Sequence, residues 1–164
     1  MLDDQKELFV VVDKDDNIVD YRTRYDCHHD KSLIHRSIGV VLFNDKGEIL
    51  LQKRSMLKDT HPGFYTLSVS GHVTKGQTYE EAALREMQEE IGIQTELTFA
   101  VKFLSELEIE TEMDMIFTGK HNGPFRIAKD EVDEVQFFSK EEITKMQAKL
   151  TPAAKHALRE LKIL

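Results

Sequence analysis

Three glutamates in the middle of the chain have the spacing that gathers carboxylates on one face of a helix. Glu86, Glu89 and Glu90 stand at i, i+3 and i+4 in a segment whose start is marked by Thr78 and Glu81, a pair with the spacing of a capping box. Like charges at this spacing cost about 0.2–0.5 kcal/mol on an exposed helix. A divalent cation would offset the repulsion, and oxygen-only ligands favour Mg²⁺ or Mn²⁺.

The same glutamates also fit an ordinary solvated helix face. Glu81, Arg85 and Glu89 are four residues apart in turn and would form opposite-charge pairs. Charge runs of this kind are commonly solubility features. Residue spacing alone therefore leaves both interpretations open.

The segment Gly71 to Ile93 resembles the Nudix box. The pattern of that box is Gly, five residues, Glu, seven residues, Arg-Glu, an aliphatic residue, any residue, Glu-Glu, any residue, Gly and an aliphatic residue. The first glutamate of the pattern is replaced by Gln77. The matching positions are Gly71, Arg85, Glu86, Met87, Glu89, Glu90, Gly92 and Ile93. The resemblance implies metal-dependent hydrolysis of a diphosphate linked to another group, carried out on an α/β/α sandwich.

The resemblance also implies roles for the box residues. Glu86, Glu89 and Glu90 are expected to be catalytic and to bind Mg²⁺ or Mn²⁺, and the carbonyl of Gly71 is a further expected ligand. Arg85 is expected to act in catalysis by orienting the glutamates through hydrogen bonds. The substrate implied is a small-molecule diphosphate, such as a nucleoside diphosphate derivative.

Two features of the chemistry stay open at this level. The general base is either Glu86 or one of three carboxylates outside the box, Glu110, Glu112 and Glu131. The amide of Gln77 cannot supply the charge of a carboxylate, so the number of metal ions is open as well.

A narrower resemblance, over most of the chain, is to the isopentenyl-diphosphate isomerase branch of the Nudix superfamily and to the hydrolases most similar to it. That isomerase binds a metal with three histidines and two glutamates. The matching residues here are His28, His35, His72, Glu110 and Glu112, and the resemblance implies a second divalent-metal site. By residue type alone, scattered histidines are equally ordinary surface or core residues.

Two residues that the isomerase needs are missing. The position of its catalytic cysteine holds Ser70, and a hydroxyl ionises far less readily than a thiol. Cys27 matches no position, and the chain has no tryptophan to face a cationic intermediate, although Phe or Tyr could replace it. Hydrolysis is therefore the favoured function. The alternatives are isopentenyl-diphosphate isomerase and a non-catalytic diphosphate-binding module.

Two neighbouring cations, Lys53 and Arg54, end a predicted strand just before the loop 55–64. They are either a solvent-exposed strand end or a pair that binds a substrate phosphate, and we treat them as candidate substrate-binding residues. The loops 55–64 and 119–134 are expected to set specificity, and neither has a pattern that reads a base or a sugar.

The predicted elements alternate hairpins with helices, which favours a mixed sheet covered on both faces, an α/β fold. Leu84, Met87 and Ile91 are expected to form the buried stripe of the central helix. Thr151 and Pro152 are expected to cap and begin the last helix. The expected strands cover residues 8–12, 18–24, 38–43, 49–54, 66–70, 97–104, 113–117 and 135–138, the helices 79–91, 140–150 and 151–161, and the loops 25–37, 105–112 and 130–134.

Length and composition set further bounds. The chain of 164 residues is expected to form a single Nudix domain over residues 1–164, with an N-terminal β-hairpin extension in 1–27 and C-terminal helices in 140–164. A net charge of −8 argues against partners such as nucleic acid or a membrane surface. A single cysteine, no signal-like start and no long apolar run predict a cytoplasmic protein. The hairpin edge offers a site for homodimer formation.

Overall fold

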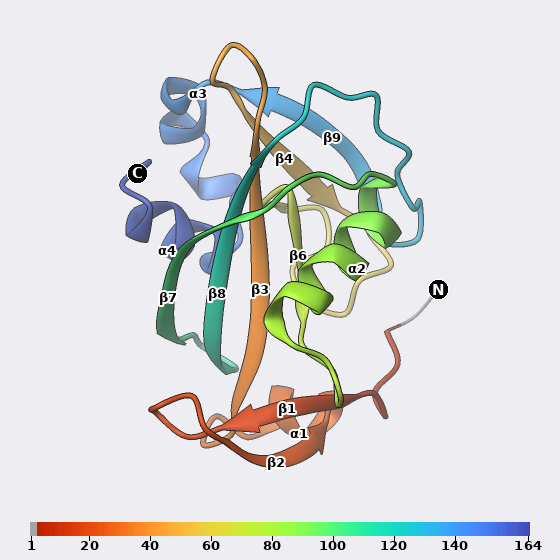
Figure 1. The fold of residues 1–164 in the computed structure, drawn as a ribbon, viewed down its shortest axis with the longest axis vertical. Coiled ribbons are helices and arrows are strands. Elements are labelled where there is room, and N and C mark those ends of the chain that lie inside the picture. The colour runs from red at the N-terminus through yellow and green to blue at the C-terminus, as the bar shows by residue number, and fades with distance from the viewer. Residues whose placement is uncertain (1–2) are drawn as a thin grey trace.

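The computed structural model describes residues 3–164, and their strands form one mixed nine-stranded sheet (Figure 1). Met1 and Leu2, at the start of the predicted hairpin segment, lie outside the described residues. The central strand is β3, which pairs antiparallel with β1, β4 and β6 and parallel with β8. The strands are β1 (Leu8–Val12), β2 (Ile18–Thr23), β3 (Ile34–Phe43), β4 (Ile49–Arg54), β5 (Tyr65–Thr66), β6 (Val69–His72), β7 (Thr98–Glu106), β8 (Thr111–Lys120) and β9 (Val132–Phe138).

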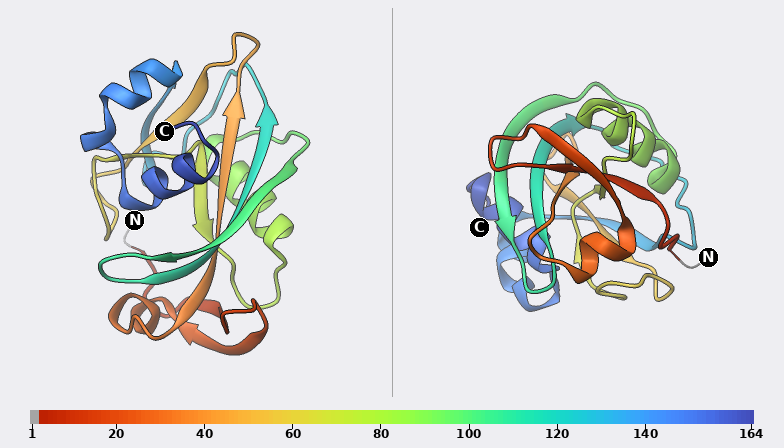
Figure 2. Two further views of the ribbon diagram at one scale, coloured as in Figure 1. Left: turned by 90° about the vertical axis from the view of Figure 1, so that its left-hand side faces the viewer. Right: turned by 90° about the horizontal axis from the view of Figure 1, so that it is seen from below.

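Helices cover both faces of this sheet. Figure 2 shows α2 (Tyr79–Ile91) on one side, and α3 (Lys140–Lys145) and α4 (Pro152–Glu160) on the other. Side chains of β3 alternate between the two cores: Val40 and Leu42 pack in the core beneath α2, and Val41 packs in the core beneath α4. The predicted α/β/α sandwich with a mixed sheet is confirmed. Within residues 3–164, no helix is long and apolar enough to cross a membrane.

Helix α2 begins and ends as predicted. Thr78 forms a capping box with Glu81, and Gly92 ends the helix with a φ of 69°, a left-handed conformation that glycine adopts without steric cost. The predicted buried stripe is confirmed at Met87 and Ile91 but is wrong at Leu84, which is 40% exposed. Two alanines at positions 82 and 83 complete the buried face in its place and let α2 pack close to the sheet.

The segment 25–37, predicted as a loop with room for a helical turn, does contain a helical turn but is mostly regular structure. A short helix, α1 (Arg24–His29), is capped by Thr23, and β3 begins at Ile34, four residues before its predicted start at Ile38. The early part of β3 is polar, so an apolar pattern could not reveal it. It forms because β8 pairs with it, with His35 opposite Glu112.

Four other predicted segments differ from the observed elements. The single strand expected over 66–70 is two strands with different partners, β5 on β4 and β6 on β3. The helix expected over 140–150 is α3 followed by a 3₁₀ turn, η1 (Gln147–Lys149). Strand β9 starts inside the expected loop 130–134, and β7 and β8 extend into the expected loop 105–112.

The hairpin of β1 and β2 is held to the rest of the molecule through Asp16 in its turn. The Asp16 carboxylate, 9% exposed, lies 2.8 Å from Nε of Arg36 on β3 and 3.0 Å from Nζ of Lys102 on β7. The hydroxyl of Tyr79 on α2 donates a third hydrogen bond to it, at 2.8 Å. Burial alone would raise the pKa of Asp16, but these hydrogen bonds outweigh burial and lower its pKa.

We expect Asp16→Asn to lower the free energy of unfolding at pH 7 by about 1–3 kcal/mol, because the buried side chain loses the negative charge that pairs with Arg36 and Lys102. The folded-state pKa is lowered, so the contribution of the carboxylate is full above the unfolded value of about 3.9 and is lost as the pH falls through the folded value. Urea unfolding between pH 7 and about pH 3 measures this. Asparagine tolerates the positive φ of 64° at this position.

The matched control is Asp15→Asn at the exposed neighbouring position, which should leave stability unchanged. A destabilisation by Asp16→Asn that stays constant down to the lowest pH would contradict the role given to the charge.

Candidate functional site

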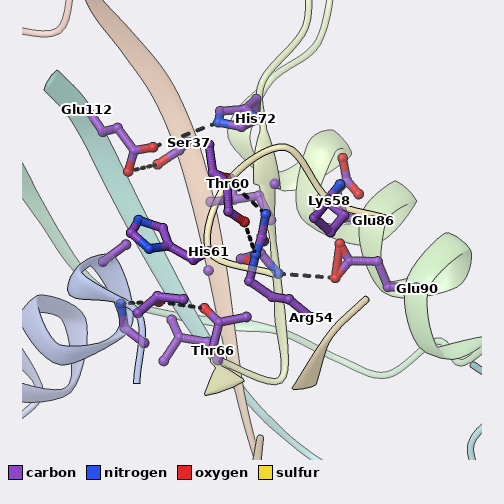
Figure 3. A pocket seen from close by; sticks show the side chains of 18 of the residues that line it. Ser37, Arg54, Lys58, Thr60, His61, Thr66, His72, Glu86, Glu90 and Glu112 are labelled. Carbon is purple, nitrogen blue, oxygen red and sulfur yellow. Dashed lines mark hydrogen bonds and ion pairs between the residues drawn. The ribbon is translucent and has the colours of Figure 1, made fainter. Parts of the chain in front are cut away.

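A cavity of about 200 Å³ opens beside the sheet between α2, the loop 55–64 and the start of α4. Figure 3 shows Glu90 of α2 on one side of it, Glu112 and His72 at another end, and Arg54 between them. Residues that carry charge or can bind metal make up much of its lining. They include Glu7, Arg24, His28, Arg54, Lys58, His61, His72, Arg85, Glu86, Glu89, Glu90, Glu110, Glu112, Asp114 and Glu131.

All three box glutamates line this cavity, and two of them, Glu86 and Glu90, are largely buried. Glu90 is 5% exposed, and its carboxylate accepts hydrogen bonds from Nε2 of Gln52 at 2.6 Å and from the backbone N–H of Ser70 at 3.3 Å. Glu86 lies against the backbone of Gly71. A Cβ at position 71 would stand 2.5 Å from the carboxyl carbon of Glu86, so this close approach requires glycine.

Arg85 contacts two of the box glutamates, Glu86 and Glu89. Its Nη2 lies 3.0 Å from Oε1 of Glu86, and its Nη1 lies 3.1 Å from Oε2 of the exposed Glu89. The same guanidinium donates to the carbonyl of His72 and to the amide oxygen of Gln77, both at 3.3 Å. Gln77 thus keeps a hydrogen bond to Arg85, although its acceptor is a neutral amide and not a carboxylate.

The buried box carboxyl groups are short of positive charge. Burial raises the pKa of Glu86 to about 7, although Arg85 opposes the rise. Burial and the neighbouring charge of Glu86 raise the pKa of Glu90 well above its ordinary value. A set of carboxylate oxygens that lacks a full complement of cations fits a hard divalent ion such as Mg²⁺ or Mn²⁺.

The structure brings together the five residues of the predicted histidine–glutamate site. They come from α1 (His28), β3 (His35), β6 (His72), the turn before β8 (Glu110) and β8 itself (Glu112). One ligand atom from each histidine and from Glu110 lie within 4.8 Å of one another. Glu112 Oε1 lies 3.5 Å from Nε2 of His35 and 3.8 Å from Nε2 of His72. We call this group the histidine cluster.

Several polar atoms of the histidine cluster converge without forming hydrogen bonds. Oε2 of Glu110 lies 2.8 Å from Nε2 of His28 and 3.4 Å from Nε2 of His35. None of these three buried atoms has a hydrogen-bond partner of acceptable geometry among the described residues. Buried ligand atoms that lie this close together, without a hydrogen bond of acceptable geometry, fit a metal ion.

Phe9 supports the histidine cluster from behind. Its ring stacks on His72 with centroids 4.2 Å apart and on His35 with centroids 5.4 Å apart. The side chain is fully buried, so it fixes the orientation of the imidazoles. Nothing in the sequence distinguishes Phe9 from the other apolar residues of β1.

Of the two cations predicted to bind phosphate together, only Arg54 lines the cavity. Its Nε donates to the carbonyl of Thr60 at 2.9 Å. Lys53 lies in a separate hollow with Tyr65 and Lys149. Successive side chains of a strand point to opposite faces, so the assignment of Lys53 is corrected: it is not part of this cavity.

Two cations that the sequence analysis did not predict, Arg24 and Lys58, line the cavity with Arg54. Lys58 places Nζ 2.6 Å from Oδ1 of Asp3 and 2.6 Å from Oε2 of Glu131, and Arg24 places Nη2 2.8 Å from Oδ1 of Asp59. Lys58 belongs to the loop 55–64, for which the sequence analysis predicted a role in specificity. Arg24 had no local signal, because only the fold brings it here.

Comparison with known proteins agrees with this geometry. Residues 33–161 match the family model of the NUDIX domain. A Nudix hydrolase of Yersinia pestis described as uncharacterized is 34% identical over 150 residues, which cover 90% of this chain and 81% of that protein. Isopentenyl-diphosphate Delta-isomerase 2 of Photorhabdus laumondii is 35% identical over 136 residues, which cover 80% of this chain and 76% of that protein.

Solved structures show the same fold. A protein of Deinococcus radiodurans superposes with a TM-score of 0.81 at 21% identity, covering 93% of this chain and 98% of that one. The MutT protein of Methanosarcina mazei Go1 gives a TM-score of 0.68 at 27% identity, covering 78% of this chain and 91% of that one. With a box helix of this geometry and a family match over most of its length, the chain belongs to the Nudix family.

Proposed function

We propose that this protein is a Nudix pyrophosphohydrolase that cleaves a diphosphate bond with the help of Mg²⁺ or Mn²⁺. The ion would be held by Glu86, Glu89 and Glu90, with the carbonyl of Gly71 as a further ligand. One observation carries the proposal: the carboxylates of α2 and the guanidinium and ammonium groups of Arg54 and Lys58 line a single cavity. Such a cavity can receive a metal-bound diphosphate.

Hydrolysis needs an activated water and neutralised phosphate oxygens, and a bound divalent ion supplies both by lowering the pKa of water and by withdrawing charge. The residues of this chain supply position. Gln52 orients the Glu90 carboxylate through its 2.6 Å hydrogen bond, and Arg85 holds Glu86 and Glu89. These contacts fix the ligands before substrate arrives, which lowers the cost of binding.

The phosphate oxygens would be bound by Arg54, Lys58 and Arg24. Lys58 and Arg24 are now neutralised by the carboxylates of Asp3 and Asp59. A diphosphate carries the same charge type and would compete for the same cations.

We assign the general base to Glu86 or Glu131. Both line the cavity, and Glu131 lies close enough to raise the pKa of Glu86. The remaining candidates, Glu110 and Glu112, belong to the histidine cluster, where they would bind the second metal ion.

We further propose that the histidine cluster binds a second divalent ion, a transition metal or Mn²⁺. Three imidazoles and two carboxylates suit such metals. The converging lone pairs of His28, His35 and Glu110 support this assignment. Relatives that are described as isopentenyl-diphosphate isomerases make isomerase the second candidate function.

No cysteine is among the described residues that line the cavity, and this favours hydrolysis over isomerisation. Ser70 lines the cavity at the position of the isomerase thiol. Cys27 is 0% exposed and packs with Phe9 and Val11, so it is not available to a substrate in the cavity. A third possibility, a binding module without turnover, is tested by the same experiment.

A panel of diphosphates that includes isopentenyl diphosphate is incubated with Mg²⁺ or Mn²⁺, and NMR is used to identify the products. We expect release of phosphate or of a phosphate monoester, and no movement of the double bond of isopentenyl diphosphate. Glu90→Gln should lower kcat by about 100-fold or more, because removing even a group that supports a metal ligand costs 10–100-fold. The control Glu80→Gln changes an exposed residue of the same helix. Isomerisation without hydrolysis, or binding without any turnover, would replace the proposal with the corresponding alternative.

Metal binding to the histidine cluster can be measured without substrate. Titration calorimetry of metal-free protein with Mn²⁺ is expected to show two classes of site, and His28→Ala should remove or weaken one of them by about 10-fold or more. The neighbouring His29→Ala is the control, because His29 is exposed and stacks on Tyr25. Two unchanged classes of site in His28→Ala would exclude the second metal.

Lys58, which lines the cavity, and Lys53, which lies in the separate hollow, provide a paired test. Lys58→Ala is expected to raise KM about tenfold or more, the equivalent of one charge-assisted hydrogen bond of about 1.5 kcal/mol. Lys53→Ala, which removes the same charge from the separate hollow, should leave KM within about twofold. Steady-state kinetics with the best substrate of the panel measures both. Equal effects of the two variants would mean that only long-range charge matters.

A further inference from the structure

The N-terminal segment places one carboxylate inside the cavity. Asp3, whose side chain is 9% exposed, lines the cavity together with Arg24 and Lys58. Its Oδ1 lies 2.6 Å from Nζ of Lys58, and its Oδ2 accepts a hydrogen bond from the backbone N–H of Asp59 at 3.0 Å. Nη2 of Arg24 lies 3.5 Å from the same Oδ2. Two cations and an N–H group that converge on a carboxylate form an anion-binding site, and the chain itself occupies it.

Neither cation depends on Asp3 for its position. The guanidinium of Arg24 makes a two-point contact with the carboxylate of Asp59, with Nε 3.0 Å from Oδ2 and Nη2 2.8 Å from Oδ1. Lys58 has a second partner, Oε2 of Glu131, at 2.6 Å. Loss of the Asp3 carboxylate would therefore leave both cations in place at the cavity wall, each with one neutralising partner fewer.

The backbone around Asp3 is anchored only locally. Within residues 3–164, the backbone of Asp3 and Asp4 forms hydrogen bonds only with Gln5 and Glu7, from Nε2 of Gln5 at 3.2 Å and from the N–H of Glu7 at 3.3 Å. The chain is fixed from Gln5 onward, because the carbonyl of Gln5 accepts a hydrogen bond from the N–H of Tyr25 at 3.1 Å. The Asp3 side chain can thus leave the cavity without breaking a hydrogen bond of the sheet.

We propose that Asp3 is an autoinhibitory residue: its carboxylate occupies the position of a substrate phosphate, and a diphosphate must displace it to reach Lys58 and Arg24. This inference rests on the proposed phosphate-binding role of these cations and adds a regulatory contact to the same cavity. The exchange replaces one anion with another. The apparent affinity for a diphosphate is reduced in proportion to the fraction of molecules in which Asp3 has left the site.

Methylenediphosphonate, a diphosphate analogue that is not hydrolysed, measures this effect without turnover. In calorimetric titration with Mg²⁺ present, we expect Asp3→Asn to have a Kd about tenfold lower than that of the wild-type protein, because one charged competitor is removed. The matched control is Asp4→Asn, which removes the same charge from the exposed neighbouring position. Its Kd should stay within about twofold of the wild-type value.

Double substitutions test whether the gain arises at the cations. In the Lys58→Ala background, the gain from Asp3→Asn should shrink to about threefold or less, because Asp3 then covers only Arg24. In the Lys53→Ala background the full gain should remain, because Lys53 lies in the separate hollow. A gain of equal size in both backgrounds would assign the effect to net charge and would overturn the inference.

Displacement can also be followed in the wild-type protein by hydrogen exchange. Saturation with methylenediphosphonate is expected to speed exchange of the amides of residues 4–7, because the segment loses its anchor in the cavity. Unchanged or slower exchange in this segment would overturn the inference. So would a Kd that Asp3→Asn leaves unchanged or raises while thermal unfolding stays cooperative, and so would a lack of binding to both proteins.

Steady-state kinetics separates this inference from the hydrolase proposal. With the best substrate of the panel, Asp3→Asn should lower KM by the same factor and leave kcat unchanged. If no compound of the panel is turned over, the hydrolase proposal fails, and the Kd values still decide on Asp3. If turnover occurs with equal KM in the two proteins, the hydrolase proposal stands and the autoinhibitory role is wrong.

Discussion

The parallel pairing of β3 with β8 is the interaction on which the site depends. Ten residue pairs run in register from Ile34 to Phe43 along β3. This register sets His35 opposite Glu112 and Ser37 opposite Asp114. A slip of one residue would turn every one of these side chains to the other face. The histidine cluster and the buried carboxyl beside it exist only in this register.

The second organising feature is that buried carboxyl groups and cationic side chains line one cavity. Buried carboxylates stand on α2 and on β8, and cations come from the loop 55–64 and from α1. Glycine at position 71 allows Glu86 to approach the strand closely, because any side chain there would occupy the place of its carboxyl group. The protein and a diphosphate are both negatively charged, so cations must lie between them. A metal ion together with Arg54 and Lys58 would meet that need.

The chain combines features of two branches of its family. The histidine cluster has the composition of the isomerase metal site, and the relatives include both Nudix hydrolases and isopentenyl-diphosphate isomerases. The thiol position holds Ser70, which lines the cavity and supports the proposed hydrolysis over proton transfer at a carbon atom.

The sequence by itself determined the local features: the box helix with its Thr78 cap, the α/β class and the N-cap at Thr151. Caps, turns and periodic faces depend on residues within one or two turns of each other. The prediction that Lys53 and Arg54 bind phosphate together did not hold, because successive side chains of a strand point to opposite faces and only Arg54 lines the cavity. Tertiary structure alone decided the contact of Ser37 with Asp114, 77 residues apart in the chain. Strand register and loop closure bring such residues together, and neither leaves a signal at short range.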